Sequence, residues 1–226
     1  EQIRNDACYH EINLTIVGMG GGFSYGSLGM SHHATEDLAI MRSLPGTQVL
    51  APGTREEAAF AIKHLLKSKG VNYLRLDKSF AEPKTFIKNE FEIGKSITYR
   101  DGNDISIFST GGILNEALKA SDKLEKKGIK SRVLNFHTIK PLDGASIKRA
   151  VLETNGIITI EEHNLIGGLT SAVSEYCMKE KVYPNIYESI GLNDEYSSIV
   201  GTQDYLRNYY KINAERILSI VENLFN

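Results

Sequence analysis

The sequence predicts an α/β fold of two consecutive domains, each with a mainly parallel sheet flanked by helices. Short runs rich in Ile, Val and Leu alternate with stretches of helical apolar spacing, which is typical of βαβ units. A segment without periodicity, around Pro83, separates two such series and indicates a linker. The stretch from Glu1 to Cys8 already has helical spacing with no capping residue before it, so we expect the first domain to be incomplete at its N-terminus.

Composition argues against several classes of function. The chain has 226 residues, of which 41% are hydrophobic and 24% charged, enough for a buried core. Its net charge of −2 provides neither a basic patch for nucleic acid nor a polybasic membrane surface, and no apolar run is long enough to span a bilayer. Cys8 and Cys177 lack the spacing of a metal or redox motif, so we expect free thiols in a cytoplasmic protein.

Proline and glycine pairs divide the first series. Pro45-Gly46 ends a helix, and Pro52-Gly53-Thr54 turns the chain and caps the next helix. Glu56 and Glu57 in the first turn of that helix suit the helix dipole. The Leu14–Val17 run is expected to be a buried strand. In order, strands are expected at 14–17, 48–51 and 72–76, and helices at 36–44 and 55–67.

The second series restarts with an apolar strand at Asp104–Ser109. Gly111-Gly112 turns the chain into a helix that Gly128 ends. Strands are expected at 104–109, 131–136 and 156–161, and helices at 114–127, 143–154 and 168–179. This alternation predicts a second, mainly parallel sheet.

The stretch from Gly18 to Glu36 is the strongest candidate for chemistry. It contains six glycines and the adjacent His32 and His33, and it follows a predicted strand. Ligands of α/β proteins bind where loops leave the carboxyl ends of strands, and glycine allows close backbone approach. Imidazole is the usual proton carrier near neutral pH. The loop lacks the lysine of a P-loop and the spacing of a dinucleotide fingerprint, and a histidine here could also be a structural cap.

Several separated stretches together resemble the C-terminal half of the transketolase family. They are GSLGMSHHATEDLAIMRSLPGTQVLAPGTREE in the first series, and FSTGG, VLNFHTIKPLD and IITIEEHNLIGGLTSAV in the second. The resemblance covers nearly the whole chain. It implies that residues 1–80 are the end of a pyrimidine-binding domain, 81–96 a linker, and 97–226 a transketolase C-terminal domain.

The resemblance implies a thiamine diphosphate-dependent enzyme that transfers a two-carbon ketol unit from a ketose phosphate to an aldose. His32 falls on the family histidine that contacts the substrate and moves protons, and His33 lies beside it as a further substrate contact. Lys78 falls where relatives carry a phosphate-binding arginine, although a solvated surface lysine is an equal alternative. Leu28 replaces an aspartate of the family loop, and Gly20 replaces a histidine that many members carry. Both changes indicate an altered donor or acceptor sugar.

The resemblance also implies what other parts of the enzyme hold. A glutamate and aromatic residues that contact the aminopyrimidine are expected upstream of Glu1, so the cofactor-binding residues of this chain are unknown. The diphosphate and its Mg²⁺ or Ca²⁺ would belong to another domain or subunit, and no metal-ligand pattern occurs here. The expected partners are a sugar phosphate, a diphosphate-binding domain or subunit, and further subunits in a homodimer or an α₂β₂ assembly, as in a split transketolase.

Three alternatives remain open. A 1-deoxyxylulose 5-phosphate synthase shares the SHH and APxxxxE patterns, and the beta subunit of 2-oxo acid dehydrogenases shares the KPLD and EEH segments. Either would use a 2-oxo acid in place of a ketose. The chain could also be a non-catalytic partner subunit that keeps the fold. Elsewhere, Glu161-Glu162-His163 is expected in a structural or interface role, and His137 in loop packing.

Overall fold

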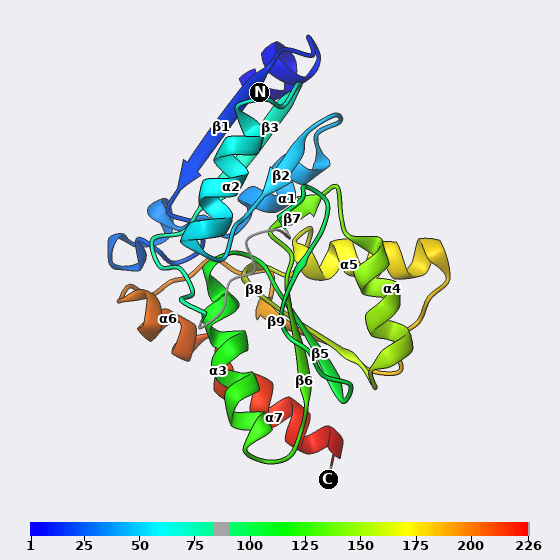
Figure 1. Ribbon diagram of the computed structural model, residues 1–226. Helices are drawn as coiled ribbons and strands as arrows, with labels where there is room; N and C mark the ends of the chain where they lie inside the picture. Colours follow the sequence, from blue (N-terminus) through cyan, green and yellow to red (C-terminus); the bar gives the residue numbers. More distant parts are fainter. Residues whose placement is uncertain (84–90, 226) are drawn as a thin grey trace.

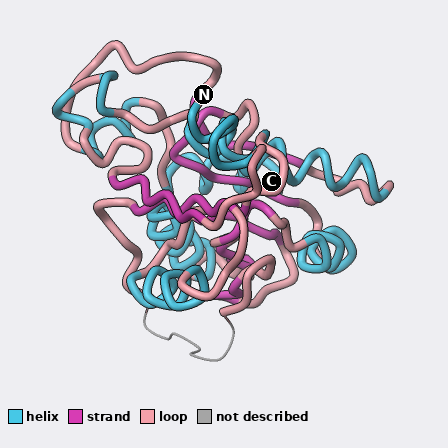
Figure 2. Tube along the Cα trace, turned by 90° about the horizontal axis from the view of Figure 1, so that it is seen from above, coloured by secondary structure: helices cyan, strands magenta, loops and turns pink. Residues whose placement is uncertain are grey.

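The computed structural model of the protein describes residues 1–83 and 91–225. Its strands form two sheets, and the N-terminus lies beside the first sheet while the C-terminus lies beyond the second (Figure 1). Helices flank the strands of both sheets (Figure 2). The predicted α/β fold with two mainly parallel sheets is therefore confirmed.

The first sheet has the strand order β1–β3–β2–β7, in which only β7 runs antiparallel to its neighbour. Its strands are β1 (Leu14–Met19), β2 (Gln48–Leu50), β3 (Val71–Leu76) and β7 (Thr138–Lys140), and its helices are α1 (Asp37–Ser43) and α2 (Arg55–Leu65). A short π-helical segment, Ile3–Cys8, precedes β1, where helical spacing was expected.

The two helices cover opposite faces of this sheet. Leu38 of α1 packs in the cluster that contains Val49, whereas Ala61 of α2 packs in the cluster that contains Leu50. Val49 and Leu50 are adjacent in β2, so their side chains point to opposite faces. Burial on both faces is what a parallel strand requires.

The start of α2 is fixed by a reciprocal pair of hydrogen bonds of the capping-box type. The Oγ1 atom of Thr54 accepts from the Glu57 N–H at 3.1 Å, and Oε2 of Glu57 accepts from the Gly53 N–H at 2.6 Å. The first bond satisfies a backbone donor that the first helical turn leaves free, and the second ties the residue before the N-cap to the helix.

The second sheet has the strand order β4–β6–β5–β8–β9, with β4 antiparallel and the others parallel. Helices α3 and α7 pack on one face and α4 and α5 on the other. The strands are β4 (Ile97–Arg100), β5 (Ile105–Ser109), β6 (Ser131–Asn135), β8 (Ile157–Asn164) and β9 (Tyr187–Leu192); the helices are α3 (Leu114–Glu125), α4 (Gly144–Glu153), α5 (Leu169–Glu180), α6 (Gln203–Tyr209) and α7 (Ala214–Phe225).

Strand β7 joins the two halves of the chain. It follows β6 in sequence, yet it pairs with β2 of the first sheet. The Ala51 N–H donates to the His137 carbonyl at 2.9 Å, and the Gly111 N–H donates to the Ala51 carbonyl at 2.9 Å. The first sheet is therefore completed by residues from the second half.

The expectation that Leu14–Val17 is a buried strand is wrong. Strand β1 lies at the edge of the sheet and pairs only with β3. Val17 is 51% exposed and Met19 is 73% exposed. Because α2 packs over β2 and β3, these apolar side chains of β1 have no helix above them in the described chain.

The sequence patterns did not predict β4, β7, β9, α6 or α7. The three strands and α6 are short or of mixed polarity, so neither periodicity is sustained in them. Helix α7, in contrast, has helical apolar spacing at Ile217, Ile220 and Val221 and could have been predicted. Much of the expected linker, residues 84–90, lies outside the described residues. Cys8 and Cys177 are free thiols. Within the described ranges, every helix is too short or too polar to span a bilayer.

Candidate functional site

The loop after β1 and the turn after β3 lie at the same edge of the first sheet. The two strands are parallel neighbours, so their carboxyl ends meet there. The Gly20 N–H donates to the Leu76 carbonyl at 2.7 Å, which ties the two connections together. This edge therefore carries His32 and His33 on one connection and Lys78 on the other.

The loop from Gly20 to His33, here called the glycine loop, is a folded structure. Gly22 and Ala34 exchange two backbone hydrogen bonds, at 2.8 and 3.0 Å, which close its base. Between them the chain makes two 3₁₀ turns, Gly26–Leu28 and Met30–His32. Gly22 has a φ of +59°, and a Cβ there would lie 2.6 Å from the Glu162 side chain, so the position requires glycine.

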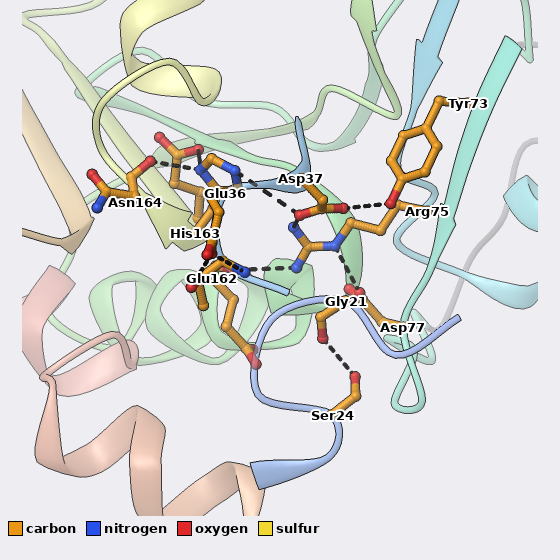
Figure 3. Close-up of polar contacts among 12 residues, drawn as sticks. Gly21, Ser24, Glu36, Asp37, Tyr73, Arg75, Asp77, Glu162, His163 and Asn164 are labelled. Atoms are coloured by element: carbon orange, nitrogen blue, oxygen red, sulfur yellow. Dashed lines mark hydrogen bonds and ion pairs between the residues drawn. The ribbon is translucent and has the colours of Figure 1, made fainter. Parts of the chain in front are cut away.

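A buried arginine lies beneath the glycine loop (Figure 3). Arg75 is 3% exposed; its guanidinium donates to Asp77 Oδ1 at 3.2 Å, to Asp37 Oδ1 at 3.4 Å and to the Glu162 carbonyl at 3.0 Å. Burial opposes the charge, but the carboxylates of Asp37, Asp77 and Glu162 outweigh it and raise the Arg75 pKa above its ordinary value. A Cβ on Gly21 would clash with Nε of Arg75, so the loop backbone rests directly on the guanidinium.

Glu162 connects the glycine loop to the second half of the chain. Its Oε1 accepts from the Phe23 N–H at 2.5 Å and from Gln203 Nε2 at 2.9 Å. Its Oε2 accepts from Arg207 Nε at 2.5 Å. The carboxylate is 3% exposed and faces protein donors, so it serves as an anchor between β8, α6 and the loop.

The residues on either side of Glu162 are also engaged within the protein. Glu161 accepts from two backbone N–H groups at the start of α5, at 2.7 and 2.8 Å, and burial raises the pKa of Glu161. The fully buried His163 donates through Nδ1 to the Asn164 carbonyl at 2.6 Å. Its Nε2 lies 4.0 Å from Asp37 Oδ1, across the junction of the two halves (Figure 3).

The two histidines of the loop have different surroundings. His32 is exposed, and its Nδ1 forms a hydrogen bond of 3.1 Å with Ser31 Oγ. His33 is half-buried, with its Nε2 donating to the Gly26 carbonyl at 3.3 Å. The rings of His33 and Phe23 pack edge to face, with their centroids 5.1 Å apart. His33 therefore packs the loop, while His32 presents its ring to solvent.

Lys78 is exposed at the same edge. Its N–H donates to Ser24 Oγ at 3.1 Å, and its ammonium lies 5.7 Å from the centroid of the Tyr25 ring. Leu28 is 55% exposed on the first 3₁₀ turn, so this position offers an apolar side chain and no hydrogen-bond acceptor.

Arg75, Asp77 and Arg207 were not expected at the site. Arg75 and Asp77 interrupt an apolar run, LRLD, at alternate positions. Charged residues are rare inside a strand that is buried on both faces, and that is the signal by which these two could have been found. Arg207 gives no such signal, since it lies 45 positions from its partner Glu162 and reaches it only through the tertiary fold.

The described residues supply no metal centre. Among residues 1–83 and 91–225, no group of three His, Cys, Asp or Glu side chains could hold a metal ion.

Two family models match the chain in succession. The model for the transketolase pyrimidine binding domain matches residues 1–83. The model for the transketolase C-terminal domain matches residues 94–217.

Similar proteins carry related descriptions. An apulose-4-phosphate transketolase subunit of Phocaeicola vulgatus is 34% identical over 96% of this chain and 69% of its own length. The 6-deoxy-6-sulfo-D-fructose transketolase subunit SqwH of a Clostridium species is 33% identical over 96% of this chain and 67% of its own length. A solved structure described as a split gene transketolase, inactive beta4 tetramer, superposes with a TM-score of 0.87 at 33% identity, covering 98% of this chain and 70% of that one.

Proposed function

Because the chain belongs to the transketolase family, we propose that it is the sugar-binding part of a thiamine diphosphate-dependent transferase. The reaction proposed is transfer of a two-carbon ketol unit from a ketose phosphate to an aldose. The observation that carries this is the shared edge of the first sheet, where the glycine loop with His32 and His33 lies beside the turn that carries Lys78. The proposal includes the predicted domain division: the end of a pyrimidine-binding domain at residues 1–80, a linker at 81–96 and a transketolase C-terminal domain at 97–226.

His32 is the proposed catalytic residue. Its Nδ1 is engaged by Ser31, while its Nε2 has no hydrogen-bond partner among the described residues. That nitrogen is free to exchange a proton with a substrate hydroxyl, a role that contributes about 10²- to 10⁴-fold in rate. His33 contacts the substrate beside it, and Lys78 binds the phosphate. Thiamine diphosphate, when bound by the assembled enzyme, supplies the electron sink for carbon–carbon cleavage.

The diphosphate, its Mg²⁺ or Ca²⁺ and the pyrimidine-contacting glutamate are assigned to another domain or subunit. Two similar proteins are named as transketolase subunits, which supports a partner chain in an α₂β₂ assembly, with a homodimer of a longer chain as the other arrangement.

An unusual sugar is part of the proposal. Exposed Leu28 cannot accept a hydrogen bond from a hydroxyl, and Gly20 has no side chain to offer one. The names of two similar proteins, which specify apulose 4-phosphate and a sulfofructose, support a donor other than the common pentose phosphate.

The test combines the chain with the diphosphate-binding subunit of a split transketolase, thiamine diphosphate and Mg²⁺. Ketol transfer is then measured with xylulose 5-phosphate and with other ketoses as donors. We expect turnover, fastest with another ketose, and a fall of about 10²- to 10⁴-fold for His32→Ala. His10→Ala, at an exposed histidine outside the loop, is the matched control and should keep full activity. Full activity of His32→Ala would refute the assigned role.

A second candidate reaction is supported by one comparison. The 1-deoxy-D-xylulose-5-phosphate synthase of Heliobacterium modesticaldum is 30% identical over 99% of this chain and 34% of its own length. Pyruvate with glyceraldehyde 3-phosphate therefore serves as a further substrate pair in the same assay. Turnover of that pair alone would replace the ketol-transfer proposal, and turnover of neither pair would favour a non-catalytic subunit.

A further inference from the structure

The backbone at Lys78 is held in place by both neighbouring segments. Oδ2 of Asp77 accepts from the Gly112 N–H at 2.5 Å, which fixes the turn to the second half. The N–H of Lys78 itself donates to Ser24 Oγ, and Ser24 Oγ donates in turn to the Gly21 carbonyl at 2.7 Å. The exposed lysine side chain therefore starts from a rigid base.

The ring of Tyr25 lies close to the ammonium group of Lys78. Lys78 Nζ lies 5.7 Å from the ring centroid, within the range of a cation–π contact. The ring also lies directly against Gly20, where a Cβ would clash with Tyr25 Cε2. Gly20 also has a φ of +97°, which disfavours any larger residue. The ring therefore lies close to both Gly20 and the Lys78 ammonium, and 36% of Tyr25 remains exposed.

The charge of Lys78 is not neutralised by its surroundings. Within the described part of the chain, no carboxylate lies within 4.0 Å of its ammonium. The nearest acidic residue in sequence, Asp77, is bound to Arg75, and Glu162 is bound to Arg207. The buried carboxylates are therefore paired internally, and the lysine remains as a free positive charge at the mouth of the glycine loop.

We propose that Tyr25 is the residue that positions Lys78, holding its ammonium where it binds a tetrahedral oxyanion at the end of the substrate. This inference rests on the proposed function, because it names the group that receives the sugar's anionic end. Both a phosphate and a sulfonate have the required chemistry. Removing the ring leaves the lysine in place but releases its four-carbon stem, so the effect falls on affinity for the anion.

The test measures binding of inorganic phosphate, and separately of sulfate, to the full chain by NMR titration. Tyr25→Leu should weaken phosphate binding about 2- to 5-fold, the range of an exposed cation–π contact. Tyr25→Phe keeps the ring and should bind as the unchanged protein does. Lys78→Met should lose binding. Tyr183→Leu, which removes an exposed tyrosine elsewhere on the surface, is the control and should bind normally.

A second variant displaces the ring of Tyr25 without removing it. Gly20→Ala places a methyl group where the ring lies and should weaken phosphate binding in the same range as Tyr25→Leu. Circular dichroism confirms that each variant is folded. Equal binding by Tyr25→Leu and the unchanged protein, or loss of binding in Tyr25→Phe, would overturn the inference, as would an absence of binding by the unchanged protein.

The two proposals fail in different ways. Anion binding is measured without cofactor or partner, so the expected order of variants would support the role of Tyr25 even if ketol transfer were never observed. Conversely, ketol transfer together with equal phosphate affinities would retain the proposed function and remove Tyr25 from it. The phosphate and sulfate arms show which of the two anions the site prefers.

Discussion

We predict that the buried Glu57 makes the stability of this protein depend on pH. The residue is fully buried at the start of α2, where Oε1 accepts from the Tyr99 hydroxyl at 2.7 Å and Oε2 accepts from Asn135 Nδ2 at 2.7 Å. Tyr99 and Asn135 belong to β4 and β6, so this carboxyl group lies at the junction of the two halves. Burial raises the pKa of Glu57 from 4.5 to about 7, although the hydrogen bonds from Tyr99, Gly53 and Asn135 act to lower it.

The sign of the effect follows from the direction of this change. A carboxyl group with a higher pKa in the folded state binds its proton more tightly there, so its contribution is fully present below pH 4.5 and is lost as the pH rises through 7. The difference between the two pKa values corresponds to about 3 kcal/mol over the whole range, most of which is lost between pH 5 and pH 8.

The variant Glu57→Gln removes the titration while keeping the shape of the side chain. We expect its free energy of unfolding to lack this decline of about 2–3 kcal/mol between pH 5 and pH 8. At pH 5 it should be about 1–3 kcal/mol lower than that of the unchanged protein, because an amide N–H₂ replaces one hydrogen-bond acceptor. The assay is urea unfolding at pH 5, 6, 7 and 8, followed by circular dichroism.

The neighbouring variant Glu56→Gln is the matched control, since Glu56 is exposed in the same helical turn and should leave the pH profile unchanged. Contributions from other titrating groups cancel when each variant is compared with the unchanged protein. A pH slope in Glu57→Gln equal to that of the unchanged protein would refute the reasoning.

Two further predictions concern the anchor of the glycine loop. Arg207→Met leaves the Glu162 carboxylate buried without its ion-pair partner and should lower the free energy of unfolding in urea by about 3–5 kcal/mol. The control Arg149→Met, at an exposed ion pair, should change it by about 0.5 kcal/mol or less. Similar losses in the two variants would contradict the role of Glu162 as an anchor. Gly22→Ala combines a left-handed φ with a clash against Glu162 and should lower the melting temperature more than Gly46→Ala does. Gly46 has a similar φ of +72° but open space around it. Equal melting temperatures of the two variants would show that the clash is relieved without loss of stability.

The sequence was a good guide where local chemistry determines structure. Thr54 and the acidic residues after it predicted the start of α2, and the glycine loop was correctly placed after a strand. His32, His33 and Lys78 could be chosen only by resemblance, and their roles remain predictions. The buried network could not be derived, because the pairing of Glu162 with Phe23 joins residues 139 positions apart. Such pairs follow from the tertiary fold and leave no periodic signal in the sequence.

The burial of β1 also could not be predicted from the sequence. An apolar run predicts a strand, but burial depends on which neighbours a strand acquires. Val17 and Met19 are exposed because β1 is an edge strand, and nothing in the run itself distinguishes an edge position from a central one.

The pairing of β7 with β2 limits how proteins with this architecture can exchange parts. A recombination that replaced everything after residue 83 would also replace Thr138–Lys140, and with it the strand that closes one side of the first sheet. The incoming strand would have to match Val49 and Leu50 in register and bury a compatible face. Substitutions in β7 and in β2 are therefore expected to co-vary among related proteins, even though the two strands lie in different halves of the chain.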